Sequence, residues 1–129
     1  MQNPYFKSKV MTADRGQLLL MLYDGAIRFN DKAINLLAEE QKLQALAPMG
    51  RTLAIVQELQ NMLDNSKAPE LCDNLERLYV YIQDQILSAQ LEGGVKPLES
   101  VAAILKELRS GWAEAIKKAS KSGELRRAG

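Results

Sequence analysis

The sequence predicts an all-α fold, an antiparallel four-helix bundle formed by a single domain over residues 1–129, with an ordered core at about 12–119. Four segments carry apolar residues at spacings of three and four, and none alternates as a strand does. The connections after the second and third segments are short, which favours antiparallel neighbours. A chain of 129 residues, 47% of them apolar, is also long enough to build a core without disulfides.

The first segment has the broadest apolar face and is predicted to be the central helix of the bundle. Two adjacent stripes share that face: Leu19, Leu22, Ala26, Ala33 and Leu37 in one, and Leu20, Tyr23, Ile27 and Ile34 in the other. Asp14, with Gln17 three residues later, resembles a capping box that starts the helix. Asp24 and Arg28 are four residues apart and can pair on its surface.

Gly25 interrupts this first apolar pattern. A glycine inside a helix costs about 1 kcal/mol relative to alanine, so its presence calls for a reason. The missing side chain lets another element approach the backbone closely. That element is either a neighbouring helix of the bundle or a bound partner, and the residues alone leave both open.

The second segment, about Met49 to Asp64, has an uncertain start because Pro48 precedes it, and residues 39–47 can be a loop or a short helical turn. The third segment begins at Pro69 and ends before Gly93, as is typical of helix ends. Its predicted core residues are Leu71, Leu75, Leu78, Ile82 and Ala89, with Tyr79 and Ile86 beside them. The spacing places Tyr79 inside and Tyr81 outside, where it is a plausible partner contact.

The last segment is predicted to run from near Pro97 to near Ser120. Its apolar stripe comprises Leu98, Val101, Leu105, Leu108, Trp112, Ala115 and Ala119. The chain from residue 117 onward carries five basic residues and one acidic residue, and we expect its polar end to be a disordered basic tail.

Composition argues against several classes of function. The chain has no histidine, which removes the usual general base and the commonest metal ligand, so we expect no enzyme, no cofactor and no metal. The net charge of +1 gives no general attraction to nucleic acid, and no apolar run is long enough for membrane insertion. The single cysteine, Cys72, and an N-terminus without a signal-peptide pattern indicate a cytoplasmic protein.

Several motifs, in order over about residues 4–115, resemble the flagellin-specific export chaperones, the FliS family. The first is TADRGQLLLMLYDGAIRF, preceded by Tyr5 seven residues before its threonine. Asn74-Leu75 with Leu78-Tyr79-x-Tyr81 is similar to the third helix of the family, and Leu105-x-x-Leu108-Arg109-x-x-Trp112 to its last. Asp14 stands where the family usually has serine, and aspartate also caps helices.

The resemblance implies a helical bundle that binds the C-terminal segment of flagellin in the cytoplasm, prevents premature polymerisation and assists type III export. The flagellar export gate is a second implied partner. Tyr5, with Phe6 and Val10, is then expected to cover an apolar groove until flagellin displaces it. Residues expected to contact the partner are Tyr5, Leu20, Tyr23, Gly25, Ile27, Arg28 and Tyr81.

Two alternatives stay open from the sequence. A helical-bundle adaptor or regulatory protein could use the same grooves to self-associate as a homodimer, and the chaperone itself could be a monomer or a homodimer. An enzyme that uses a carboxylate or lysine is the second alternative.

Overall fold

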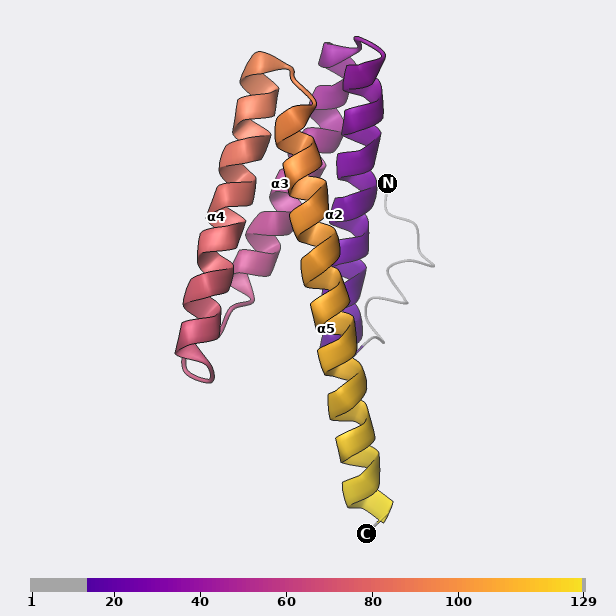
Figure 1. The fold of residues 1–129 in the computed structure, drawn as a ribbon, viewed down its shortest axis with the longest axis vertical. Coiled ribbons are helices and arrows are strands. Elements are labelled where there is room, and N and C mark those ends of the chain that lie inside the picture. Colours follow the sequence, from indigo (N-terminus) through magenta and orange to yellow (C-terminus); the bar gives the residue numbers. More distant parts are fainter. Residues whose placement is uncertain (1–13, 129) are drawn as a thin grey trace.

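The structure, a computed structural model, describes residues 14–128, with side chains described to residue 121. It contains four helices and no strand over that range: α2 (Arg15–Ala38), α3 (Lys42–Asn61), α4 (Pro69–Glu92) and α5 (Lys96–Ala128). Successive helices run in opposite directions (Figure 1), and α2 and α4 each pack against both α3 and α5. The predicted antiparallel four-helix bundle is confirmed.

Helix α2 begins and continues as the sequence predicts. The Asp14 carboxylate accepts a hydrogen bond from the backbone N–H of Gln17 at 2.7 Å, so the predicted N-cap is confirmed. The helix passes through Gly25 without a break. Gly25 is buried, and a Cβ atom there would lie 3.4 Å from Ile55 Cδ1 on α3. The element that approaches Gly25 in the bundle is therefore the neighbouring helix.

Helix α3 starts earlier than the predicted Met49. It begins at Lys42 and includes Pro48, which is buried. A proline within a helix leaves one backbone carbonyl without its usual donor. The Thr52 hydroxyl donates to the carbonyl of Pro48 itself at 3.0 Å, and the apolar residues Ala45 and Met49 are buried. Tertiary burial thus outweighs the local effect of the proline.

Helices α4 and α5 are joined by a tight turn. Gly93 adopts φ +75°, the left-handed conformation typical of a helix C-cap, and its N–H donates to Ala89 at 2.8 Å. Helix α5 runs to Ala128, past the predicted end near Ser120. Residues 121–128 contain one glycine and no proline, so the chain carries no strong signal that ends the helix there.

The core is apolar along most of the bundle. Its largest fully buried side chains are Tyr23, Tyr79, Met49, Leu59, Ile82, Ile86, Leu98 and Leu105. Asn30 is a buried polar residue whose side chain donates to the Leu98 carbonyl at 2.8 Å, which ties α2 to the first turns of α5.

The described residues contain neither a helix long and apolar enough to cross a membrane nor a group of three or more acidic or cysteine residues placed to bind a metal ion. Cys72 is buried, and its thiol donates to the Asp64 carbonyl at 3.3 Å. This contact gives the cysteine a packing role at the start of α4.

An apolar groove at the open end of the bundle

One end of the bundle is open, and a groove lies there. We call it the open end: it comprises the start of α2, the end of α3, the start of α4 and the second half of α5, which extends beyond the other helices (Figure 1). Two adjoining pockets, of about 370 Å³ and about 250 Å³, share Leu71, Leu75 and Trp112. We treat them as one surface, the groove. Its other apolar lining includes Leu19, Leu59, Met62, Leu63, Leu108 and Ile116.

The groove forms because the helices that line it end at different levels of the bundle. Helix α3 ends at Asn61, and the chain then crosses to Pro69 through a seven-residue loop. Leu71, in the first turn of α4, is 50% exposed there, although the sequence places it in the core stripe. Cys72 in the same turn is buried, so the turn itself is covered and Leu71 lies at the exposed edge of the inward face of α4. The placement of Leu71 in the core is therefore wrong.

Two tyrosines and a tryptophan form a hydrogen-bonded network at the floor of the groove. The Tyr23 and Tyr79 hydroxyls lie 2.5 Å apart, and the Trp112 indole N–H donates to the Tyr23 hydroxyl at 3.2 Å. Tyr79 and Trp112 line the groove, whereas Tyr23 lies behind them and is fully buried. The network joins α2, α4 and α5, so it fixes the orientation of the indole between the two halves of the groove.

Burial dominates the acid–base properties of the tyrosine pair. It raises the pKa of Tyr79 and of Tyr23 above the ordinary value of 10.0, because a phenolate is poorly solvated inside the bundle. For Tyr79 the hydrogen bond with Tyr23 acts in the same direction, whereas for Tyr23 the bonds with Tyr79 and Trp112 act against it. Both phenols are neutral at physiological pH.

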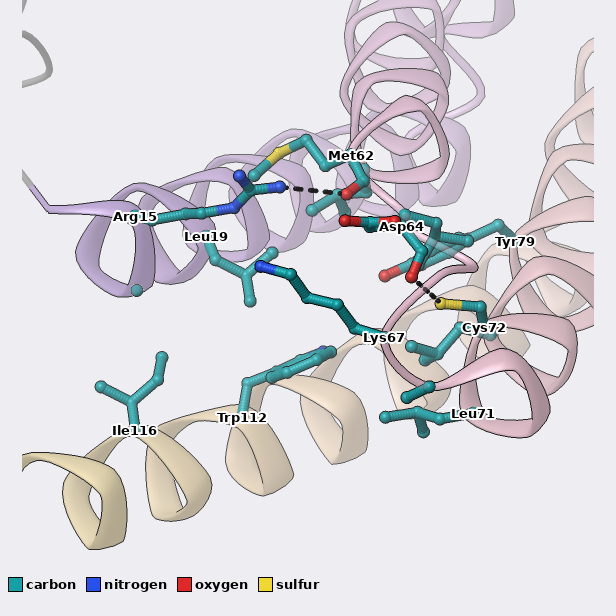
Figure 2. Close-up of a pocket in the computed structure, with 15 residues that line it drawn as sticks. Arg15, Leu19, Met62, Asp64, Lys67, Leu71, Cys72, Tyr79, Trp112 and Ile116 are labelled. Atoms are coloured by element: carbon teal, nitrogen blue, oxygen red, sulfur yellow. Dashed lines mark hydrogen bonds between the residues drawn. The ribbon is translucent and has the colours of Figure 1, made fainter. Parts of the chain in front are cut away.

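Charged residues form one rim of the groove. Figure 2 shows Arg15 on α2 and Lys67 on the α3–α4 loop beside the apolar lining, with Asp64 near them. Arg15 donates to the Met62 carbonyl at 3.3 Å. The Ser66 hydroxyl and backbone N–H both donate to the Asp64 carboxylate, and these bonds, with a smaller contribution from Lys67 and Arg15, lower the pKa of Asp64 from 3.8.

The molecule is a helical bundle with an apolar groove that no described residue fills. Residues 1–119 match the family described as "Flagellar protein FliS". The chain belongs to the FliS family.

Relatives named as flagellar secretion chaperones align with this FliS-family chain over nearly its whole length. FliS of Campylobacter jejuni is 33% identical over 113 residues, covering 87% of this chain and 88% of the relative. FliS of Salmonella typhimurium is 30% identical and FliSB of Pseudomonas aeruginosa 28% identical, and these alignments cover 88% and 86% of this chain and 85% and 88% of the relatives. A solved structure titled as a flagellar chaperone from bacteria has the same fold, with a TM-score of 0.75 and 24% identity, and covers 92% of each chain.

Of the residues that the family resemblance suggests for partner contact, those within the described part of the chain do not line this groove. Tyr23 and Gly25 are buried, and Leu20 and Ile27 are partly buried on α2. None of these four lines the groove, although Tyr23 supports it through Trp112. Tyr5 lies outside the described residues, as do Phe6 and Val10.

The remaining two suggested residues are on the surface. Arg28 is exposed and lies over the Phe29 ring, 5.3 Å from its centre. Its predicted pairing with Asp24 is wrong: Asp24 instead accepts from Arg109 on α5 at 2.7 Å, because α5 passes beside that face of α2. Tyr81 is 44% exposed and Tyr79 is buried, which confirms the predicted orientation of the two tyrosines.

The sequence contained one signal for the groove that the helix stripes alone did not resolve. The predicted last helix, from near Pro97 to near Ser120, is longer than the predicted second helix, about Met49 to Asp64, and its apolar stripe continues through Trp112 to Ala119. Apolar residues that extend past the end of a shorter helix must be covered by another element or remain exposed. Assigning the whole stripe to the core overlooks this difference in helix length.

Proposed function

We propose that this chain is a flagellar secretion chaperone that binds the C-terminal segment of flagellin in the cytoplasm, prevents its premature polymerisation and assists its type III export. The observation that carries the proposal is the apolar groove, which lies in a bundle of the FliS family. The chain acts by binding and not by catalysis, in keeping with a sequence that has no histidine.

An open apolar groove suits a ligand that folds when it binds. A disordered amphipathic segment loses conformational entropy on ordering, and burial of its apolar residues must compensate for that loss. Leu71, half exposed in the free protein, and the partly exposed Trp112 provide such burial. Contacts of this kind hold the segment while leaving its release possible, which export requires.

The direct test is titration calorimetry with a peptide of the C-terminal segment of flagellin from the same organism. We expect one-to-one binding with a large negative heat-capacity change and a gain of helix by circular dichroism. Leu71→Glu should weaken binding at least about tenfold, because it places a charge against an apolar surface. Leu71 is exposed enough for the variant to fold.

Leu91→Glu is the matched control, since it makes the same change on α4 at the other end of the bundle, where Leu91 is 87% exposed. Equal loss in both variants would remove the groove from the proposal. Failure of the unmodified protein to bind both the peptide and full-length monomeric flagellin would refute the chaperone function. Sizing at several protein concentrations would then test the self-associating bundle.

The predicted cover formed by Tyr5, Phe6 and Val10 is tested separately, because these residues lie outside the described part of the chain. Removal of residues 1–10 should raise the affinity for the flagellin peptide if they occupy the groove. Unchanged affinity, together with unchanged protease sensitivity of this segment, would remove the idea.

A further inference from the structure

The rim of the groove carries two cations that have no carboxylate partner among residues 14–121. The ion pairs in that range involve other basic residues, namely Lys106, Arg109 and Lys118. Arg15 makes a single side-chain hydrogen bond, to the Met62 carbonyl, which leaves most of its N–H donors available. Figure 2 shows the Lys67 side chain extending across the pocket towards Leu19 on α2.

The acidic residue that lines the same pocket as these cations forms its side-chain hydrogen bonds with Ser66 instead. Asp64 lines the same pocket, but its carboxylate accepts two hydrogen bonds from Ser66, at 2.5 Å from the hydroxyl and 3.1 Å from the backbone N–H. It forms no ion pair with Arg15 or Lys67 within 4 Å. This part of the rim therefore keeps an excess of positive charge.

The start of α4 brings the partial positive charge of a helix amino end to the same place, and Glu70 in its first turn offsets part of it. Its N-cap is Ala68, which has no side chain to accept from the first N–H groups, and Ala68 lines the pocket. The amino end of a helix carries a partial positive charge that favours an anion. The other half of the groove has the opposite character, because its charged lining residue is Glu107 on α5.

We infer that the Arg15–Lys67 side of the groove binds an aspartate or glutamate side chain that flanks a large apolar anchor of the bound segment. The anchor packs between Leu71, Leu75 and Trp112, and the carboxylate lies at the cationic rim. Because the pocket is open at the rim, the ligand chain can run past the cations. Glu107 disfavours the same acidic group in the other half, so the charges also fix the direction of the segment.

This inference rests on the proposed flagellin binding, and its test uses the same peptide. Each aspartate and glutamate of the peptide is changed in turn to its amide, and the affinity is measured for the unmodified chaperone and for an Arg15→Gln/Lys67→Gln double variant. The double variant should bind about tenfold more weakly, because each of the two exposed charges contributes about threefold, and it should lose most of the salt dependence of binding.

The pairing is identified by coupling. One acidic position of the peptide should matter for the unmodified protein and not for the double variant, and a lysine at that position should restore affinity to Lys67→Glu. Lys32→Gln, a charge change of the same size at an exposed site elsewhere on α2, should leave affinity unchanged. Lys67→Gln alone removes no side-chain hydrogen bond found among the described residues, so its effect does not depend on altered folding.

Three outcomes would overturn the inference. If Leu71→Glu abolishes binding while the double variant binds normally, the groove binds flagellin without reading a carboxylate. If only C-terminal amidation of the peptide weakens binding, the cations read the chain terminus instead of a side chain. If the unmodified protein binds neither peptide nor flagellin, the proposed function fails and the inference with it.

Discussion

The network of Tyr23, Tyr79 and Trp112 predicts an unequal response to two similar substitutions. Tyr23 is its centre, because its hydroxyl bonds both the Tyr79 hydroxyl and the Trp112 N–H. The Tyr23 oxygen has two lone pairs, so it can accept from both the Tyr79 hydroxyl and the Trp112 N–H. Tyr79→Phe removes one bond and leaves the Trp112 bond in place. Tyr23→Phe removes both bonds and strands two donors.

The magnitudes follow from this count. A typical hydrogen bond contributes about 0.5–1.5 kcal/mol net, and a buried donor left unsatisfied costs about 1–3 kcal/mol. Tyr79→Phe should therefore lower the free energy of unfolding by about 1 kcal/mol. Tyr23→Phe should lower it by about 2–4 kcal/mol, since Tyr79 is only 1% exposed and water cannot readily replace its partner. Trp112 is more accessible and contributes less to this difference.

Urea unfolding followed by circular dichroism measures both losses. At a common dependence on denaturant, the Tyr23→Phe midpoint should fall at least twice as far as the Tyr79→Phe midpoint. Tyr81→Phe is the control, because Tyr81 is exposed and its hydroxyl lies 3.3 Å from that of Ser100; it should change stability by less than about 0.5 kcal/mol. If Tyr79→Phe is as damaging as Tyr23→Phe, the donor count is wrong.

Three further predictions concern stability. Above about pH 10 the unfolded chain loses tyrosine protons that the buried pair keeps, so the free energy of unfolding should fall with rising pH. Urea midpoints compared across that range should fall less steeply in Tyr79→Phe. Gly25→Ala should stabilise the helix by up to about 1 kcal/mol, because its Cβ would meet Ile55 Cδ1 at an acceptable 3.4 Å. If calorimetry shows unchanged flagellin affinity, the glycine serves bundle packing; if the affinity falls, the glycine serves ligand binding. Gly93→Ala should lower the free energy of unfolding by about 1–2 kcal/mol, because φ +75° is strained for alanine. The flexible end of Lys42 can move away from the new Cβ, so it adds little. An unchanged melting temperature would contradict this prediction.

The sequence predicts the helices well wherever local signals agree with burial. Asp14 marks the start of α2 because its carboxylate accepts a hydrogen bond from the first turn, and Gly93 marks the end of α4 because it has no side chain and adopts a left-handed conformation. Both effects act within one turn of the helix. At Pro48 the local signal and burial disagree, and the start of α3 predicted from that proline is therefore wrong. Its local effect suggests a boundary, but Ala45 and Met49 on either side are buried in the core, and this long-range packing sets the true boundary.

The candidate site is less predictable because periodicity identifies a buried face but not its partner. Leu71 and Leu75 share one stripe, yet one is half exposed and the other is 4% exposed. Cys72, next to Leu71, is only 6% exposed, so the buried face at this end of α4 passes through Cys72 and Leu75, and the spacing of the leucines does not encode that shift. Tyr23 shows the opposite case: the family motif suggests contact with the partner, and the structure assigns it to the support behind the groove.

Helix length explains why the groove lies where it does and what kind of ligand completes it. At 1.5 Å per residue the 33 residues of α5 extend about 50 Å, whereas the 24 residues of α2 and of α4, the helices that pack against it, extend about 36 Å, so α5 continues past its neighbours. A ligand helix in the groove supplies this missing neighbour without entering the core. The Tyr23–Tyr79–Trp112 network can then stay intact on binding, and release breaks only groove contacts. Under the proposed function, this lets a chaperone hold its substrate firmly and still give it up for export without unfolding itself.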